Sequence, residues 1–556
     1  MRERPFVRNG KTLLSGIDPV RRAERTADAV SVRDRTLYFC PSPLYGYGLA
    51  RLLARLEEAP GSAALCIEAD PELYELSEKS IDPSLAANKK LRITNICESE
   101  ALCAFVREAW GARTFRRVET VRLSGGWQLF PELYDSLGEA LRRAIATDWS
   151  NALTLAMLGR LYIRNALRNL SLIPRFPSIS NLSFGSSPVL ALGAGPSLDE
   201  TLDALGCRFS ETLCRPEERP FKIICVDTCL GALRDRNIVP DLAVILESQH
   251  WNLRDFVGCL GWNVPAAVDL SALPESAQML GEGFLFMTPW TPLRVFERLK
   301  EAGLLPSVIP PLGSVGLSAV ELARRVSRGK IICAGLDFSF TADKYHARST
   351  PGHRSRLNTQ TRLKSVINAI YGGASFAAVS KSGLSVRSNP SMQNYRNLFE
   401  QEFASDPRLF DIAGSGLSLG IKTLSMEEAL LLLAAEDTEG IKINHGIAQR
   451  KEEGELLKEK MLPFLHGEKE RLKDLRDILT GEAAADHGRL NGLIDECDYL
   501  WAHFPDYSGG RRPGLTEISC GSQGAASFLK RLRTEIDPAL ALIERVMLSL
   551  TEMTCA

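Results

Sequence analysis

The stretch VLALGAGPSLDE, Val189–Glu200, decides the fold class of this chain. Its apolar run stops at Gly193, Gly195–Ser197 turns the chain, and Ser197 with Glu200 forms the Ser-x-x-Glu pattern that starts a helix. The stretch therefore predicts a strand, a glycine turn and a helix N-terminus. In open α/β sheets, phosphates and nucleotides bind at such a junction because unpaired backbone N–H groups face the turn.

The composition bounds the class of protein. A chain of 556 residues is too long for one core, so we expect two to four domains. A net charge of −1 gives no field that would select nucleic acid or an anionic membrane. No apolar run approaches the length of a membrane span, and the N-terminus lacks the apolar core of a secretory signal. The 13 cysteines contain no Cys-x-x-Cys pair, which is typical of a reduced, cytoplasmic protein.

The pattern along the chain divides it into three regions, 1–165, 166–423 and 424–556. The first region reads as strand, glycine turn at Gly46 and Gly48, helix and strand, with Glu68 at the end of the second strand. This Rossmann-like pattern lacks the full glycine fingerprint. Glu68 would contact a ribose in a nucleotide-binding domain; the alternative, which we favour, is a structural α/β domain that binds nothing.

The second and third regions differ in their hydrophobic period. Apolar runs without alternation in the second region predict parallel strands that are covered on both faces. Leucines and other apolar residues at helical spacing in the third region predict an amphipathic bundle. We therefore expect an α/β protein with a Rossmann-like N-terminal domain, a central Rossmann-like domain and a C-terminal α-helical bundle. The predicted strands lie in KIICVDTCL (222–230), DLAVILES (241–248), AAVDL (266–270), FLFMTPW (284–290) and KIICAGLDFSF (330–340).

Polar residues follow several of these strands. The carboxyl ends of parallel strands meet at one edge of a sheet, so residues there share a site. We expect such a site to contain the turn Gly193–Ser197, Asp227 with Thr228, Glu247 with Ser248, and Asp337.

A second glycine loop, PPLGSVGLSAVELARR (310–325), opens another predicted helix. Ser314 is the candidate N-cap, and no acid follows before Glu321, so free N–H groups and the helix dipole would hold a carboxylate or phosphate. In the first loop, Asp199 and Glu200 are expected to satisfy part of the helix terminus. That loop would then act mainly by close approach of its backbone to the ligand.

A polar segment, FSFTADKYHARSTPGHRS (338–355), leaves the last predicted strand. Such a segment can cover a site, and His346 or His353 would serve as a general base near neutral pH. The alternative is a surface loop with incidental histidines.

The ordered motifs resemble a known family. GAGPSL, VDT, a Pro-Asp pair before a strand, GSVG, GLDFSFTADKYHA and DIAGSGLSLGIKTLSMEEAL occur in the order found in motility-associated factor (Maf) proteins, bacterial glycosyltransferases that modify flagellin. The central domain is also similar to bacterial sialyltransferases that use CMP-sialic acid. The resemblance implies that the loop Gly193, Gly195, Pro196 and Ser197 approaches the nucleotide. It implies further ligand contacts at Asp227 and Glu247, where the sialyltransferases carry asparagines; Thr228 and Ser248, beside them, stay candidates from their place at the strand ends.

The same resemblance implies a mechanism. The loop at Ser314, Val315 and Gly316 would fix the carboxylate of a CMP-activated nonulosonic acid, of the pseudaminic or legionaminic type. A serine or threonine hydroxyl of flagellin would attack the anomeric carbon. The base would be His346 or His353, with Asp337 or Asp227 orienting or replacing it, and Tyr345 would assist the departing phosphate. We expect no required cofactor and no metal site, although Glu247 and Asp337 carry oxygens of the kind that Mg²⁺ prefers.

Two other functions stay open at this point. The superfamily includes proteins that resemble 6-hydroxymethylpterin diphosphokinase, which transfer a diphosphate from ATP and need Mg²⁺. A flagellar chaperone or scaffold would use the helical bundle instead, and would tolerate loss of Asp337.

Overall fold

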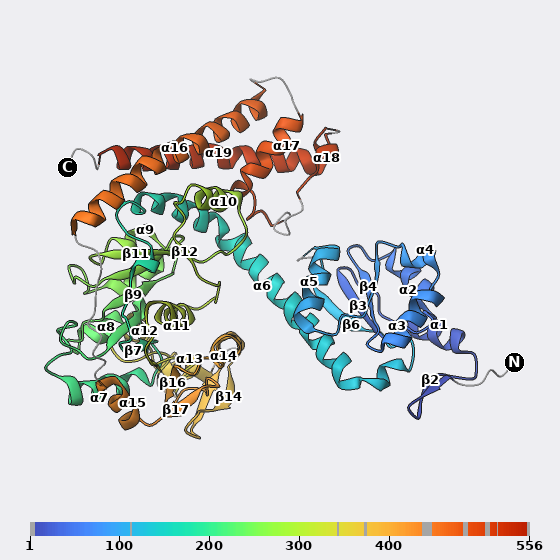
Figure 1. The fold of residues 1–556 in the computed structure, drawn as a ribbon, viewed down its shortest axis with the longest axis horizontal. Coiled ribbons are helices and arrows are strands. Elements are labelled where there is room, and N and C mark those ends of the chain that lie inside the picture. Colours follow the sequence, from blue (N-terminus) through green and yellow to red (C-terminus); the bar gives the residue numbers. More distant parts are fainter. Residues whose placement is uncertain are drawn as a thin grey trace. The chain divides into compact units, whose positions relative to one another are not determined.

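The computed structural model describes residues 6–111, 114–341, 344–371, 375–435, 447–481, 487–505, 512–519 and 521–552 (Figure 1). The chain forms two compact units. The first comprises Met1–Gly159 and Trp501–Arg512, and the second comprises Arg160–Leu500 and Pro513–Ala556. The division into three domains at residues 165 and 423 stays a prediction.

The first unit is built on a parallel sheet of order β5-β4-β3-β6. Gly46 and Gly48, with φ of +72° and +81°, turn the chain from β3 into α2, as the sequence predicted. Its strands are β3 (Thr36–Pro41), β4 (Ala63–Ile67), β5 (Leu91–Thr94) and β6 (Arg117–Thr120), beside the antiparallel pair β1 (Phe6–Arg8) and β2 (Lys11–Leu14). Its helices are α1 (Pro19–Ala29), α2 (Leu49–Leu56), α3 (Pro71–Ser80), α4 (Pro83–Ala86), α5 (Ser99–Trp110) and η1 (Gly126–Leu129); α6 (Pro131–Asn169) begins here.

Glu68 is part of the interior of the first unit. Its carboxylate is 1% exposed and accepts hydrogen bonds from Ser42 Oγ (2.7 Å) and the Tyr134 hydroxyl (3.3 Å). Burial raises the pKa of this carboxyl group. Glu68 therefore joins the loop after β3 to the helix α6, which supports the structural interpretation over a ribose contact.

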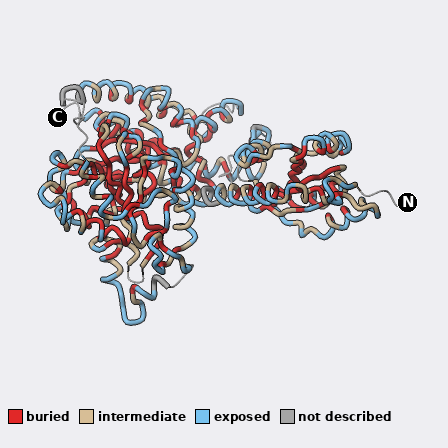
Figure 2. Tube along the Cα trace, turned by 60° about the horizontal axis from the view of Figure 1, so that its bottom comes forward, coloured by how far each residue is buried: buried red, intermediate tan, exposed pale blue. Residues whose placement is uncertain are grey.

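The second unit contains a nine-stranded sheet in which every pairing is parallel. Its order is β12-β11-β10-β9-β8-β7-β13-β16-β17. The strands are β7 (Val189–Leu192), β8 (Lys222–Val226), β9 (Leu242–Ile245), β10 (Ala266–Asp269), β11 (Gly283–Met287), β12 (Ser307–Val308), β13 (Ile331–Ala334), β16 (Leu409–Ile412) and β17 (Lys422–Leu424). Every residue of β7 to β11 and of β13 is buried, and Figure 2 shows this interior in red beneath exposed helices. The predicted covered strands are confirmed.

The strand order reverses at β7. From β7 to β12 the chain adds strands on one side, and β13 then pairs with β7 on the other side. Ligands of open α/β sheets bind at such a switch point, outside the carboxyl ends of the strands. The stretch that decided the fold thus lies at the position where this architecture places a site.

Helices surround this sheet. The helix α11 (Val315–Val326) packs across β7, β8, β9 and β13. The others are α7 (Leu198–Phe209), α8 (Leu230–Arg234), α9 (Pro274–Ala277), α10 (Arg294–Glu301), α12 (Pro351–Thr359), α13 (Val366–Tyr371), α14 (Pro390–Phe403) and α15 (Met426–Ala434). Short 3₁₀ turns are η2 (Leu170–Leu172), η3 (Ile179–Asn181), η4 (Asp227–Cys229), η5 (His250–Phe256) and η6 (Asp498–Leu500), and β14 (Phe376–Val379) and β15 (Ser385–Ser388) form a hairpin.

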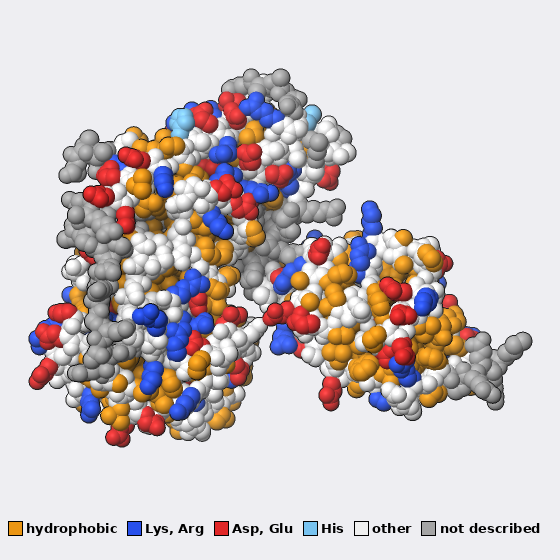
Figure 3. Space-filling model, in the orientation of Figure 1, with side chains coloured by type: hydrophobic (Ala, Val, Ile, Leu, Met, Phe, Trp, Pro, Cys, Tyr) orange, Lys and Arg blue, Asp and Glu red, His pale blue; other side chains and the backbone are white. Residues whose placement is uncertain are grey.

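The C-terminal region is helical, as predicted. The long helices α16 (Ile447–Thr480) and α19 (Gln523–Glu552) pack together, with α17 (His487–Glu496) and α18 (Leu515–Ser519) beside them. The apolar positions that set the prediction are buried, among them Leu472, Leu475, Phe528, Leu532 and Ile536. Figure 3 shows positive and negative side chains interspersed on the face drawn, in keeping with the balanced net charge. Within the described ranges, no helix has the length and apolar character needed to span a bilayer.

Candidate functional site

The glycine turn after β7 is held by the loop after β13. Gly193 N–H donates to Ala334 O and Gly195 N–H to Gly335 O, both at 2.8 Å. The carboxylate of Asp337 then receives two hydrogen bonds from Ser197, one from its N–H (2.7 Å) and one from its hydroxyl (2.5 Å). Asp337 therefore clamps the first turn of α7.

The helix start predicted from the Ser-x-x-Glu pattern is confirmed, but the predicted hydrogen bond between the Ser197 side chain and the helix is wrong. The helix α7 does begin at Leu198, but Ser197 makes no side-chain bond to the helix because its hydroxyl is committed to Asp337. Asp199 does not fill the terminus of its own helix either. Its carboxylate accepts from Arg348 N–H (3.1 Å) and Lys344 Nζ (2.8 Å), both on the polar segment that follows β13.

Two glycines enclose Asp337. A Cβ on Gly195 would lie 2.6 Å from Asp337 Oδ2, and one on Gly416 would lie 2.6 Å from Oδ1. The side chain is 2% exposed. Burial raises the pKa of Asp337, and the two bonds from Ser197 act in the opposite direction. Both carboxylate oxygens are thus engaged within the protein.

The second glycine loop has the expected form. Ser314 is the N-cap of α11, its side chain makes no capping bond, and the first turn carries no acid. The helix dipole and the first N–H groups of α11 therefore face little local competition.

The two glycine loops meet at one side chain. Leu336 Cδ2 lies 2.6 Å from the position that a Cβ would occupy on Gly193, and 2.6 Å from the corresponding position on Gly316. The N-terminus of α11 is therefore next to the turn after β7. The sequence predicted that both loops belong to one site, and this contact brings them together.

The polar pair after β8 is joined by Asn252 and Asp255, which the sequence analysis missed; Asp227 and Asn252 are buried, and Thr228 and Asp255 are half-buried. Asp227 Oδ1 accepts from Thr228 N–H (2.8 Å), and its Oδ2 accepts from Asn252 Nδ2 (2.6 Å). The Thr228 hydroxyl also reaches Asp255 Oδ2 at 3.5 Å. Burial raises the pKa of Asp227 to about 6, and burial together with the charge of Asp227 raises that of Asp255 to about 7. This pair can hold a proton near neutral pH.

The carboxyl ends of β9 and β10 carry further polar residues. Glu247 Oε1 accepts from Gln249 N–H at 2.8 Å, and Ser248 is buried, with its carbonyl accepting from Asn165 Nδ2 at 3.0 Å. Beside them, Asp269 is fully buried and joins β10 to β11 by accepting from Thr288 N–H at 2.7 Å.

Two aromatic side chains, Tyr162 and Trp290, lie near these polar residues. The rings of Tyr162 and Trp290 lie 5.5 Å apart. Burial raises the pKa of the Tyr162 phenol to about 12, and the nearby carboxylates of Glu247 and Asp269 add to the rise. Trp290 Nε1 is buried and has no hydrogen-bond partner among the described residues, whereas the Thr288 hydroxyl is turned to the carboxylate of Asp269. The indole N–H of Trp290 is therefore the donor here that a ligand could use, although no sequence pattern pointed to it.

The polar segment after β13 lies directly on the first glycine turn. Ala347 N–H donates to Ala194 O at 3.0 Å. Tyr345 packs against Phe340, with ring centroids 4.3 Å apart, and the guanidinium of Arg356 lies over its ring. Positions 342 and 343 of this segment lie outside the described residues.

The two candidate bases differ in environment. His346 Nδ1 is buried without a hydrogen-bond partner among the described residues, and burial, with the charge of Arg356, lowers its pKa to about 4. Its imidazole is therefore neutral near neutral pH. His353 is in the first turn of α12, where its N–H donates to the Thr350 hydroxyl at 3.4 Å.

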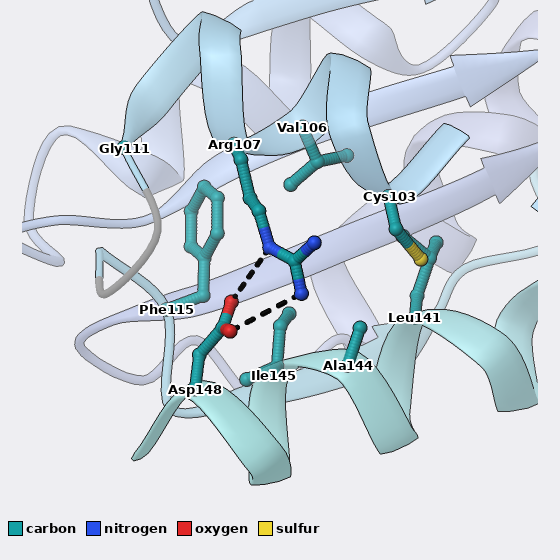
Figure 4. A pocket seen from close by; sticks show the side chains of 9 residues that line it. All are labelled: Cys103, Val106, Arg107, Gly111, Phe115, Leu141, Ala144, Ile145 and Asp148. Atoms are coloured by element: carbon teal, nitrogen blue, oxygen red, sulfur yellow. Dashed lines mark hydrogen bonds and ion pairs between the residues drawn. The ribbon is translucent and has the colours of Figure 1, made fainter. Parts of the chain in front are cut away.

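A small cavity of about 10 Å³ lies between α5 and α6 in the first unit (Figure 4). Arg107 and Asp148 face each other across it, with their closest atoms 3.1 Å apart, among apolar side chains. Such a volume holds about one water molecule. This cavity therefore does not serve as a substrate site.

Comparisons with known proteins agree with this architecture. Residues 163–343, from the end of α6 to beyond β13, match a family model described as 6-hydroxymethylpterin diphosphokinase MptE-like. An uncharacterized protein of Treponema pallidum (strain Nichols) is 30% identical over 554 residues, which cover 95% of this chain and 91% of that protein. The chain belongs to the same family as this treponemal protein.

A solved structure extends the comparison to the fold. The Maf glycosyltransferase from Magnetospirillum magneticum AMB-1 is similar over 99% of this chain and 83% of its own, with 15% identity and a TM-score of 0.52. The likeness confirms the α/β fold class. It also confirms, at the level of the fold, the resemblance to Maf proteins that the motifs indicated.

Proposed function

We propose that this protein is a glycosyltransferase. In this proposal it transfers a nonulosonic acid of the pseudaminic or legionaminic type from a CMP-activated donor to Ser or Thr of flagellin, and so supports flagellar assembly and motility. The observation that carries the proposal is the meeting of two glycine loops at Leu336, beside the switch point of the parallel sheet. The similarity in fold to a Maf glycosyltransferase also supports the proposal.

The two loops suit the two ends of such a donor. The turn Gly193–Ser197 lets a nucleotide approach the backbone closely, because glycine leaves no Cβ in the way. The acid-free N-terminus of α11, at Ser314–Gly316, suits the carboxylate beside the anomeric carbon. A nucleotide monophosphate leaves with one phosphate, so the chemistry needs no metal.

The proton of the acceptor hydroxyl goes to His346 in this proposal. Its imidazole is neutral and Nδ1 has no hydrogen-bond partner among the described residues, so it can accept a proton, and its pKa of about 4 makes it a weak base until the bound substrates raise that pKa. Tyr345, the next residue, assists the departing phosphate. Asp337 and Asp227 act by positioning: Asp337 holds Ser197, and Asp227 orders Thr228 and Asn252.

The direct test is incubation of the full chain with flagellin and a CMP-nonulosonic acid, followed by mass spectrometry of the flagellin. We expect added glycan on Ser or Thr. His346→Gln should abolish transfer while leaving CMP binding intact, and His353→Gln should retain transfer. The opposite result for the two variants would move the base to His353, and no added mass with a competent donor would refute the activity.

The family model gives a second candidate, transfer of a diphosphate from ATP to a hydroxymethylpterin. Thermal shift measurements separate the two. Stabilisation by CMP alone favours the nucleotide sugar, whereas stabilisation by ATP with Mg²⁺, together with pterin-dependent consumption of ATP, favours the kinase. The acids after β8 and β9 would then be the first residues to examine as Mg²⁺ ligands.

A further inference from the structure

A separate cleft in the second unit carries positive charge. It lies between the end of α6, η2 and α19, and its volume is about 470 Å³. Small-molecule sites have volumes of roughly 300 to 1,000 Å³. Three arginines, Arg164, Arg168 and Arg545, line it.

Glu275 is the acidic neighbour of these guanidinium groups: it pairs with Arg168, and the charge of Arg164 also acts on its carboxylate. Arg168 Nη2 lies 2.6 Å from Glu275 Oε1. Arg164 and Arg545 form no hydrogen bond or ion pair with any described residue, and both are exposed. Three arginines against Glu275 therefore leave the cleft with a net excess of two positive charges.

A buried acceptor also lines the cleft. Asn169 is 1% exposed, and its Nδ2 donates to Leu270 O (3.0 Å) and Ala272 O (2.8 Å). Its Oδ1 is buried and has no partner among the described residues. An unpaired buried carbonyl is unfavourable, so a donor from a ligand or an ordered water is expected there.

We propose that this cleft binds a small organic anion that carries a hydrogen-bond donor. Its phosphate or carboxylate oxygens accept from Arg164 and Arg545, whose planar forks fit both groups. Its donor reaches Asn169 Oδ1, and its apolar part lies on Leu172 and Val546, which also line the cleft. This site uses none of the residues of the proposed glycosyl transfer and does not depend on that function.

Isothermal titration of the full chain with citrate and with pyrophosphate, at constant ionic strength, tests the proposal. Citrate carries carboxylates and a hydroxyl, whereas pyrophosphate carries phosphate oxygens, so the two probes separate the sources of negative charge. We expect saturable binding of at least one probe. The double variant Arg164→Gln/Arg545→Gln should weaken it by at least roughly tenfold, because each lost charged hydrogen bond contributes about 1.5 kcal/mol or more.

The control is Arg533→Gln, which removes an exposed arginine of α19 that does not line the cleft. This variant should bind the probes as the wild type does. Because Arg164 and Arg545 are exposed and unpaired, both variants should unfold at the wild-type temperature without ligand. Equal binding by the double variant, no binding of either probe, or binding of an acidic peptide such as poly-glutamate alone would overturn the proposal.

Discussion

The clamp between Ser197 and Asp337 gives a quantitative prediction. Ser197→Ala removes the 2.5 Å hydrogen bond from the hydroxyl to Asp337 Oδ1 and leaves that oxygen buried without a donor. A buried charged acceptor that loses its partner destabilises a protein by roughly 2 to 3 kcal/mol. Asp337→Asn has a different effect, because an amide can keep both contacts. Its oxygen accepts from Ser197 N–H, and its nitrogen donates to the Ser197 hydroxyl.

We therefore expect Asp337→Asn to change stability by less than about 1 kcal/mol, since it exchanges two charged hydrogen bonds for neutral ones but removes a buried carboxylate. Urea unfolding should rank the variants, and hydrogen exchange should localise the effect to the peptide that contains β7 and the start of α7. If that region opens locally, Ser197→Ala should raise its exchange rate by roughly 30- to 150-fold, because 1.4 kcal/mol is a factor of ten.

The matched control is Ser382→Ala, which removes an exposed hydroxyl. This variant should exchange at the wild-type rate in the same peptide. The clamp is refuted if Ser197→Ala also exchanges at the wild-type rate, or if Asp337→Asn is as damaging as Ser197→Ala. Loss of glycosyl transfer in a stable Asp337→Asn variant would instead give Asp337 a role in the reaction through its charge.

Three further predictions concern glycine and titrating groups. Gly195→Ala should lower the free energy of unfolding by more than about 2 kcal/mol, because the new Cβ meets Asp337 and a backbone oxygen; the midpoint of urea unfolding measures this. The folded-state pKa of His346, about 4, lies below its unfolded value, so stability should fall by up to about 3 kcal/mol as the pH drops from roughly 6.5 to 4. The variant His346→Gln should lose that part of the pH dependence. The pKa of Asp255, about 7, lies above its unfolded value, so its contribution to stability decreases as the pH rises from about 4 to 7. Because the charge of Asp227 contributes to this rise, Asp227→Asn should lower the pKa of Asp255, as measured by NMR titration. An unchanged pKa in the variant would contradict the coupling between the two carboxyl groups.

The fold was predictable from local patterns because buried parallel strands leave uninterrupted apolar runs. The strands β7 to β11 and β13 were all found in this way, as were the two glycine loops. Both loops were also assigned to one site, since the carboxyl ends of parallel strands share an edge.

The partners of the site residues were not predictable. The hydroxyl of Ser197 was assigned to its own helix, but the structure gives it to Asp337, which is 140 positions away in the chain. A local rule cannot weigh a distant carboxylate against a nearby backbone N–H. Asn252 and Asp255 were missed for a related reason, because they lie in the 3₁₀ turn η5, whose sequence has no hydrophobic period.

The contact of Leu336 with Gly316 has an evolutionary consequence. Among the described residues, a Cβ on Gly316 would clash with Leu336 Cδ2 alone, at 2.6 Å, since Ser314 Oγ lies at an ordinary contact distance of 3.6 Å; a Cβ on Gly193 would also meet the Gly335 carbonyl oxygen at 2.5 Å. A shorter side chain at position 336 can therefore compensate for alanine at 316, but not for alanine at 193. Among homologous sequences, positions 316 and 336 should covary, while position 193 should accept nothing but glycine.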